Sequence, residues 1–291
     1  MQITLQNGLC TAVADTRGGE LVSFRDAGAE YIWGGDPAYW SGRNPILFPI
    51  VGSLKNGRVL INGQEYEMAR HGFARRSEFT LAQQGGSFAV LELRDSPATL
   101  TQFPYPFLLR VRHDLLDGGF TTTFEVENPG PDPLPFCIGG HTAFRCPFHD
   151  GERFEDYQLL FDRGEDAVPL CPTADGLLSR EGTGPALSGR SIPLTHAPFD
   201  ELDTLIFQDL RSTGVALVHQ GTGRGVHMDF AGFPMVAFWT PSNANAPFLC
   251  LEPWQGCAAY VDEDGEFLHK PGCAVLLPGE RKTLAYTVRT V

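Results

Sequence analysis

The stretch LRVRHDLLDGGFTTTFEV at residues 109–126 decides the fold class. On both sides of its central Asp-Gly-Gly, apolar residues alternate with polar ones, so one face of each half can be buried while the other meets water. A period of two is typical of half-buried β-strands, and Asp-Gly-Gly is typical of a tight turn. Residues 109–126 therefore predict two strands of an antiparallel sheet.

Similar strand patterns extend through the rest of the chain. Further strand-like runs occur at 88–93, 215–218, 235–239 and 284–288. No helical period is sustained beyond about two turns, although 199–205 suggests a short helical turn. The Gly/Pro/Ser-rich segment 173–189 is expected to be a long loop, and strand signals resume after it with similar composition. We therefore predict an all-β protein, one large antiparallel β-sandwich domain covering residues 1–291.

Composition limits the partners and the compartment. The chain has 22 basic and 35 acidic residues, a net charge of −13, which disfavours binding to nucleic acid and to anionic membranes. The seven cysteines are an odd number without a C-x-x-C pair, as expected for reduced thiols in a reducing compartment. The N-terminus lacks a signal-peptide pattern, and no apolar run approaches the ~18–20 residues of a membrane helix. We expect a cytoplasmic protein.

Four segments place polar residues beside glycine or within an otherwise apolar run. They lie at 42–52, 70–75, 139–144 and 248–254. Such a pattern indicates a site where the backbone approaches a ligand closely and the side chains are partly desolvated.

Glu252 and Trp254 belong to the last of these segments. Glu252 follows an apolar run and precedes Pro253, so we expect it at the end of a buried strand, where burial would raise its pKa toward that of a general base. A carboxylate that caps backbone amides or pairs with an arginine is the alternative. Trp254 offers a flat face on which a sugar ring can stack, or it simply packs in the core.

Two histidines lie beside glycines. A neutral His141 after Gly139 and Gly140 can donate or accept a proton near pH 7, although a core histidine bonded to a carbonyl fits the sequence as well. His71 has cations nearby that disfavour its protonation, so it is expected to bind a hydroxyl as a neutral group.

Three further charged residues are candidate ligand contacts. Arg43 and Arg75 are possible donors to a ligand, and Asp203 is a possible acceptor for sugar hydroxyls. Each can equally be a solvated turn or capping residue.

Together these segments resemble the aldose 1-epimerase (galactose mutarotase-like) family, in its bacterial branch related to hexose-6-phosphate epimerases. The resemblance is carried by 45–52, 71–75, 140–144 and 251–254 and covers nearly the whole chain. It implies a β-supersandwich with a sugar site on its concave face. It also implies an isomerase that interconverts the α and β anomers of an aldose without a metal or other cofactor, because only protons move.

The resemblance also implies a role for each candidate residue. Glu252 matches the family's catalytic base and His141 its catalytic acid. The other matches concern substrate binding: His71, Arg75, Asp203 and Arg43.

The substrate and two rival functions stay open at this point. Arg43, Arg70, Arg75 and Arg76 together would suit a phosphate, so the substrate is either a hexose or a hexose phosphate. A carbohydrate-binding protein on the same fold would need neither Glu252 nor His141. A glycosidase would use Glu252 and Asp203 as its carboxylate pair. A monomer and a homodimer are equally compatible with the sequence.

Overall fold

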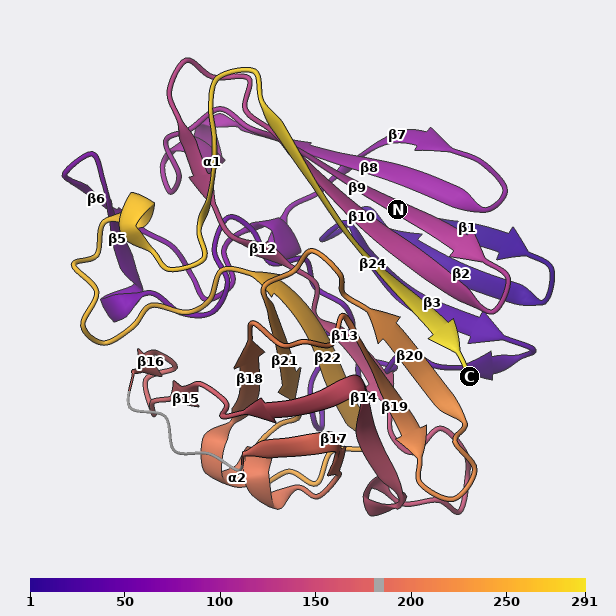
Figure 1. Cartoon of the computed structure of the whole chain (residues 1–291). Coiled ribbons are helices and arrows are strands. Elements are labelled where there is room, and N and C mark those ends of the chain that lie inside the picture. Colours follow the sequence, from indigo (N-terminus) through magenta and orange to yellow (C-terminus); the bar gives the residue numbers. More distant parts are fainter. Residues whose placement is uncertain (181–185) are drawn as a thin grey trace.

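The hairpin predicted from residues 109–126 lies inside a large antiparallel sheet in the computed structural model of the protein (Figure 1). The structure describes residues 1–180 and 186–291. Strands β9 (Leu108–Leu116) and β10 (Gly119–Glu127) pair with His113 opposite Thr122, and their side chains alternate between buried and half-buried. The period of two in the sequence thus gives each strand one face toward the core.

Nine strands form this sheet in the described part of the chain, in the order β17-β14-β19-β20-β24-β10-β9-β8-β7. Besides β9 and β10 they are β7 (Thr80–Gln84), β8 (Phe88–Arg94), β14 (Tyr157–Ala167), β17 (Leu187–Pro193), β19 (Gly214–His219), β20 (Gly225–Asp229) and β24 (Arg281–Thr290). β24 pairs with β10 on one side and with β20 on the other. The C-terminal strand therefore joins strands from both halves of the chain in one sheet.

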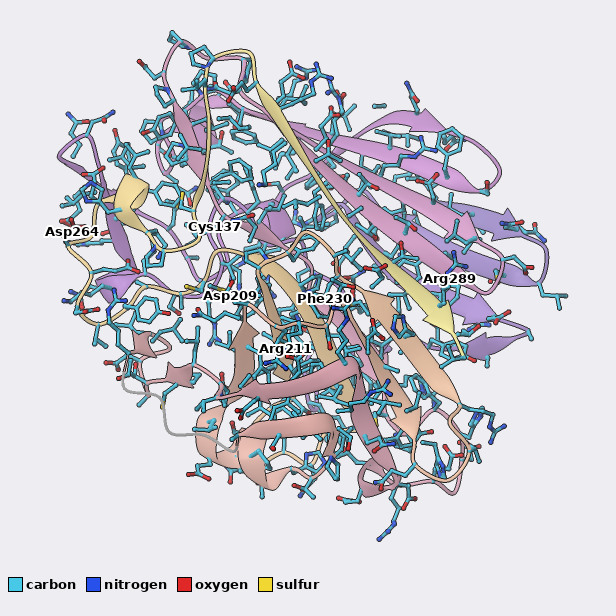
Figure 2. All side chains as sticks on the ribbon, viewed as in Figure 1. Cys137, Asp209, Arg211, Phe230, Asp264 and Arg289 are labelled. Atoms are coloured by element: carbon cyan, nitrogen blue, oxygen red, sulfur yellow. The ribbon has the colours of Figure 1, made fainter. Side chains whose placement is uncertain are left out.

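A second, five-stranded sheet packs against the large one. Its strands are β12 (Ile138–Gly139), β13 (Thr142–Arg145), β18 (Thr204–Gln208), β21 (Met235–Trp239) and β22 (Phe248–Gln255). Phe161 of β14 contacts Phe207 and Phe238 of the smaller sheet, with ring centroids 6.2 and 5.9 Å apart. Figure 2 shows the side chains that fill the space between the strands. The predicted antiparallel β-sandwich is confirmed.

Strand β22 divides its residues between two faces. Leu249 and Leu251 belong to the core between the sheets, whereas Cys250 and Glu252 lie on the opposite face. Alternation along a strand requires this division. The face that carries Glu252 is the outer face of the five-stranded sheet, and the candidate site is built there.

The remaining elements are small. A four-stranded sheet of β1 (Gln2–Asn7), β2 (Cys10–Asp15), β3 (Glu20–Asp26) and β4 (Ala29–Glu30) contacts β8 and β9. Three two-stranded ladders pair β5 (Arg58–Ile61) with β6 (Gln64–Glu67), β11 (Leu134–Phe136) with β23 (Ala274–Leu276), and β15 (Cys171–Pro172) with β16 (Leu178–Ser179). The helices are α1 (Pro97–Leu100), α2 (Ala197–Leu202) and 3₁₀ turns at Lys55–Gly57, Ala74–Arg76, Phe154–Asp156 and Phe267–His269.

Two local expectations differ from the structure. The segment 173–189 is not one loop, because β16 lies within it and β17 begins at Leu187; its residues 181–185 lie outside the described part. Strand β22 does not end at Glu252 but runs on through Pro253. Proline lacks the N–H that a ladder uses, yet its carbonyl still accepts a hydrogen bond, here from Gly140 at 3.1 Å.

The structure contains no disulfide among the described residues. All seven cysteines are free, and five of them are buried. Among the described residues, no helix has both the length and the apolar character that crossing a membrane requires.

Candidate active site

A cavity of about 210 Å³ opens on the outer face of the five-stranded sheet. Six of the seven site residues predicted from the sequence line it: His71, Arg75, His141, Asp203, Glu252 and Trp254. A larger hollow of about 670 Å³ lies elsewhere and is bordered by exposed residues such as Arg76 and Arg94. Buried titratable groups converge on the smaller cavity, which is the better candidate for chemistry.

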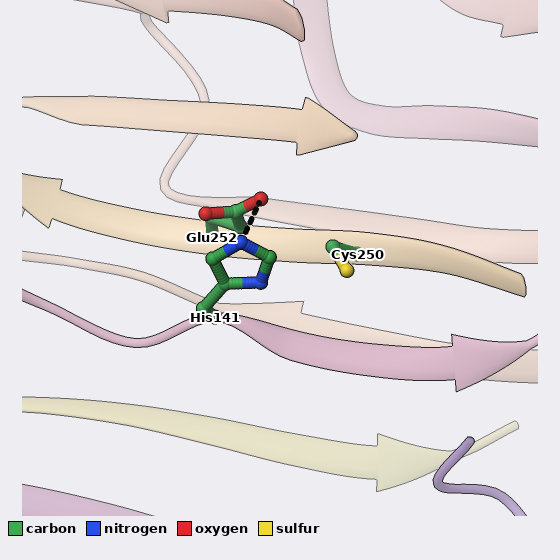
Figure 3. Close-up of side chains that lie close together, drawn as sticks. All are labelled: His141, Cys250 and Glu252. Carbon is green, nitrogen blue, oxygen red and sulfur yellow. Dashed lines mark ion pairs between the residues drawn. The ribbon is translucent and has the colours of Figure 1, made fainter. Parts of the chain in front are cut away.

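His141 and Glu252 form a buried pair in this cavity. Nε2 of His141 lies 3.3 Å from Oε1 of Glu252, and the two side chains are only 7% and 1% exposed (Figure 3). Pairing of β12 and β13 with β22 sets this contact, with Gly139 opposite Trp254. A Cβ on Gly139 would lie 2.6 Å from the Trp254 ring, and one on Gly140 would lie 2.8 Å from the Tyr286 ring. Glycine at both positions therefore lets the histidine segment lie flat on the sheet.

Burial disfavours the charged form of both partners. It raises the pKa of Glu252 well above its ordinary value, an effect that the guanidinium groups of Arg70 and Arg75 oppose. Burial, reinforced by the charge of Arg75, lowers the pKa of His141 well below its ordinary value. The two groups are therefore driven toward one shared neutral state, a protonated carboxyl beside a neutral imidazole.

Cys250 lies beside the pair. Its thiol comes from the same face of β22 as Glu252, and one ligand atom from each of Cys250, His141 and Glu252 lies within 4.8 Å of the others (Figure 3). All three residues are buried. Together the three side chains form a group that could hold a metal ion.

His71 is held as a neutral hydrogen-bond donor. Its Nδ1 accepts the N–H of Gly52 at 3.1 Å, so the ring proton resides on Nε2. Burial is the main cause that lowers its pKa, and nearby His141, Arg70 and Arg75 add to the effect. The sequence predicted a neutral His71 from its cationic neighbours alone, whereas burial contributes more.

Gly72 positions His71 through the main chain. With φ at +71°, Gly72 adopts a conformation that side chains disfavour, and a Cβ there would overlap the carbonyl oxygen of Phe48. That oxygen accepts the N–H groups of Phe73 and Ala74 at 3.1 and 3.2 Å. These hydrogen bonds hold the segments around residues 48 and 72 together, and His71 thereby lies at the cavity.

Asp203 stands at the cavity wall with several partners. It follows α2 with φ at +61°, a strained value for a residue other than glycine. Its Oδ1 accepts the indole N–H of Trp239 at 3.2 Å, and its Oδ2 accepts the hydroxyl of Thr204 at 2.9 Å. Arg70 pairs with Oδ2 at 3.6 Å. The carboxylate is therefore fixed in one orientation.

Aromatic residues missed in the sequence form another wall of the site. The Trp40 indole stacks on the His141 imidazole, with centroids 5.0 Å apart and planes 26° apart, and Trp239 meets the same imidazole edge-on at 5.6 Å. Trp239 ends a strand that the sequence predicted, and Trp40 comes just before the first polar segment. In the sequence, only their positions beside a predicted strand and a predicted site segment indicated that these two tryptophans belong to the site.

The arginines are not gathered into one patch. Arg70 and Arg75 line the cavity, whereas Arg76 borders the 670 Å³ hollow. Arg43 is not among the residues that line the cavity, and its guanidinium donates to the carbonyl of Val22 at 3.3 Å. The four-arginine phosphate site considered from the sequence is therefore not formed.

Comparisons with known proteins agree with this arrangement. The plasmid and chromosomal forms of protein LacX from Lactococcus lactis subsp. lactis are each 35% identical to this chain, with 99% of both chains covered. A galactose mutarotase related enzyme from Lactobacillus acidophilus superposes with a TM-score of 0.94 at 28% identity, covering 100% of this chain and 97% of that one. A galactose mutarotase-like protein from Lactobacillus casei gives the same TM-score at 27% identity, with 100% of both chains covered.

A family model supports the same assignment along nearly the full length. The model described as aldose 1-epimerase matches residues 1–287. A match of this extent, together with the LacX relatives, shows that the chain belongs to the aldose 1-epimerase family.

Proposed function

We propose that this protein is an aldose 1-epimerase that interconverts the α and β anomers of an unphosphorylated hexose. The observation that carries the proposal is the 3.3 Å contact between His141 and Glu252 in a cavity suited to one small ring. Mutarotation needs one proton acceptor at the anomeric hydroxyl and one proton donor at the ring oxygen. A carboxyl and an imidazole side by side supply both.

The pair can pass one proton through the sugar. Glu252, as the carboxylate, takes the proton of the anomeric hydroxyl while His141, as the imidazolium, protonates the ring oxygen. The C1–O5 bond breaks and leaves the open-chain aldehyde beside a neutral pair. Rotation about C1–C2 turns the other face of the aldehyde toward the C5 hydroxyl. His141 then accepts the hydroxyl proton, Glu252 returns its proton to the aldehyde oxygen, and the ring closes as the other anomer.

The local electrostatics favour one stage of this cycle. Burial favours the neutral pair, which accompanies the open-chain aldehyde. Arg70 and Arg75 favour the Glu252 carboxylate but disfavour the His141 imidazolium, so their charges act in opposite senses on the two proton carriers. Ring closure returns the pair to the carboxylate and imidazolium, which completes the proton exchange that mutarotation requires.

The other cavity residues orient the sugar. His71 offers its Nε2–H and Arg75 its guanidinium to hydroxyl groups, and the fixed carboxylate of Asp203 accepts from them. Trp254 provides a flat surface for the C–H groups of the ring.

Charge at the cavity mouth favours a neutral substrate. An adjoining hollow of about 370 Å³ is lined by Asp175, Asp200, Glu201 and Asp203, and among the described residues Arg70 is the cation that lines it. Arg70 is itself paired with Asp203. A phosphate dianion would meet a surplus of carboxylates there, which repels it. The sequence left hexose and hexose phosphate open, and this surface supports the hexose.

The rival functions account for less of the site. A sugar-binding protein would have no use for a buried carboxyl and imidazole in contact. A glycosidase would need Asp203 free to act as the second carboxylate, but both of its oxygens accept hydrogen bonds from neighbouring side chains.

The test is magnetisation exchange between anomers measured by NMR. We expect the wild-type protein to accelerate exchange of glucose or galactose far more than that of glucose 6-phosphate. Wild-type protein that binds hexoses by calorimetry without accelerating exchange would instead support a binding protein. Faster exchange of glucose 6-phosphate than of glucose would overturn the neutral-substrate assignment.

A further inference from the structure

The thiol of Cys250 has no part in the proposed proton transfer, yet it lies against the residues that perform it. Cys250 precedes Glu252 by two positions on β22, so both side chains leave the same face of the strand. Its Sγ, a carboxylate oxygen of Glu252 and a ring nitrogen of His141 lie within 4.8 Å of one another. Cys250 is fully buried and does not line the cavity.

The three donors are those that zinc prefers. Zn²⁺ binds thiolate sulfur, imidazole nitrogen and carboxylate oxygen, often with three protein ligands and one open position. Bond lengths of about 2.0–2.3 Å in a tetrahedral site place the nitrogen and oxygen about 3.4 Å apart. The corresponding atoms of His141 and Glu252 are 3.3 Å apart in this structure. The sulfur of Cys250 lies within 4.8 Å of the other two donor atoms, and it needs to approach them by about 1 Å to reach the spacing of a zinc site.

One unused polar atom in the same cluster points to a ligand. Oε2 of Glu252 is buried and makes no hydrogen bond within the described residues; Nδ1 of His141 is also unpartnered, but it lies on the other edge of the ring from Nε2 and would not bind the same ion. Both residues are more than nine-tenths buried. A buried polar atom without a partner in a native structure calls for an explanation, and a bound ion is one of the recognised explanations.

We propose that His141, Cys250 and Glu252 form a zinc-binding site through which Zn²⁺ inhibits the protein. Zn²⁺ binding displaces the thiol proton of Cys250 and the proton that the neutral pair holds on Glu252. The ion therefore bonds to a thiolate and a carboxylate, and two protons are released. The thiolate and the carboxylate together neutralise the ion, so no net charge is left in the buried cluster. A water molecule from the cavity completes the tetrahedron.

Inhibition follows from the position of the ion, and this part of the inference rests on the proposed function. Zn²⁺ would occupy the donor atoms that must carry the proton to and from the sugar. Mutarotation should therefore be lost while zinc is bound and should recover when a chelator removes it. Substrate and zinc should compete, because both need His141 and Glu252.

Metal binding is tested first without any measurement of activity. Chelator-stripped protein is titrated with Zn²⁺ against a chromophoric chelator, and with Co²⁺, whose thiolate complexes show a sulfur-to-metal charge-transfer band. The variants are Cys250→Ser and, as a matched control, Cys146→Ser, because Cys146 is another fully buried thiol and does not line the cavity. Thermal unfolding establishes that both variants fold.

We expect wild-type and Cys146→Ser protein to bind one Zn²⁺ and to show the cobalt–thiolate band. Cys250→Ser should lose the band and bind Zn²⁺ more than about 100-fold more weakly, because loss of an outer-shell partner alone costs up to that much. Its mutarotation without metal should resemble that of the wild type but should no longer be inhibited by zinc. Glu252→Gln should also weaken zinc binding.

The outcomes separate the two proposals. An unchanged cobalt band and zinc affinity in Cys250→Ser, or no zinc binding by the wild type, would overturn the zinc site whatever the activity. Zinc binding that depends on Cys250 in a protein without mutarotase activity would keep the site and reject the proposed function.

Discussion

The indole of Trp40 stacks on the imidazole of His141, with ring centroids 5.0 Å apart and planes 26° apart. Trp239 meets the same imidazole edge-on, so two tryptophans hold the ring that faces Glu252. No protein group bonds Nδ1 of His141 among the described residues. Packing on tryptophan therefore takes the place of the hydrogen bond that commonly orients a catalytic histidine.

Removing this stack should slow catalysis more than it weakens binding. Trp40→Ala frees the His141 ring to turn away from the ring oxygen, so we expect kcat for mutarotation to fall about 10- to 100-fold. Trp40→Phe retains a stacking surface and should lose much less. Steady-state kinetics of both variants measure these changes in kcat. A Trp40→Ala variant with the wild-type kcat would contradict the role proposed for the stack of Trp40 on His141.

The two proton carriers should act as one unit. Glu252→Gln and His141→Asn should each lower kcat by about 10²–10⁴-fold while the fold is retained, since each removes one proton-transfer group at little change in volume. The kcat of the double variant should be only slightly lower than that of either single variant, because neither proton-transfer group works without the other. Anomer exchange by NMR measures all three, and fully additive losses would argue against a coupled pair.

Gly72 should tolerate no side chain. Gly72→Ala adds the strain of a positive φ to an overlap with the Phe48 carbonyl, and we expect the free energy of unfolding to drop by about 3 kcal/mol or more. Gly63→Ala is the matched control: its φ of +74° is similar, but a Cβ there would meet nothing within 4 Å. That variant should lose only about 1–2 kcal/mol. Urea denaturation compares the two, and equal losses would show that contact with Phe48 does not matter.

Glu20 should make stability depend on pH. Burial raises its pKa from 4.5 to about 7, an effect opposed by the N–H of Asn44 at 2.8 Å and by the charges of Arg75 and Arg43. The folded state therefore holds this proton more tightly than the unfolded state. The resulting stabilisation is fully present below pH 4.5 and is lost as the pH rises through about 7, a change of roughly 3 kcal/mol.

Glu20→Gln removes that titration. The unfolding free energy of the variant relative to wild type should rise by roughly 3 kcal/mol between pH 4.5 and pH 8. Urea denaturation across this range tests the sign as well as the size. Parallel curves for the two proteins would mean that Glu20 has an ordinary pKa in the folded state.

Local sequence determined the strands and most of the site. Alternation at 109–126 predicted β9 and β10 because burying one face of a strand requires a period of two, whatever the partner strand. Glycine beside His71 and His141 marked close approaches of the main chain, which a Cβ would prevent. The family resemblance then assigned roles to these residues and to Glu252.

Tertiary structure alone decided which side chains meet. Trp40 and His141 are 101 positions apart, and Cys250 reaches His141 only because β12 and β13 both pair with β22. Arg43 and Arg75 look alike in the sequence, but only Arg75 lines the cavity. Alternation along a strand specifies the face of each residue and not the neighbouring strand. The order of strands in the sheets depends on packing of the whole core. It therefore determined that Trp40 and Trp239 lie against His141, that carboxylates line the adjoining hollow, and that the thiol of Cys250 lies beside the proton carriers.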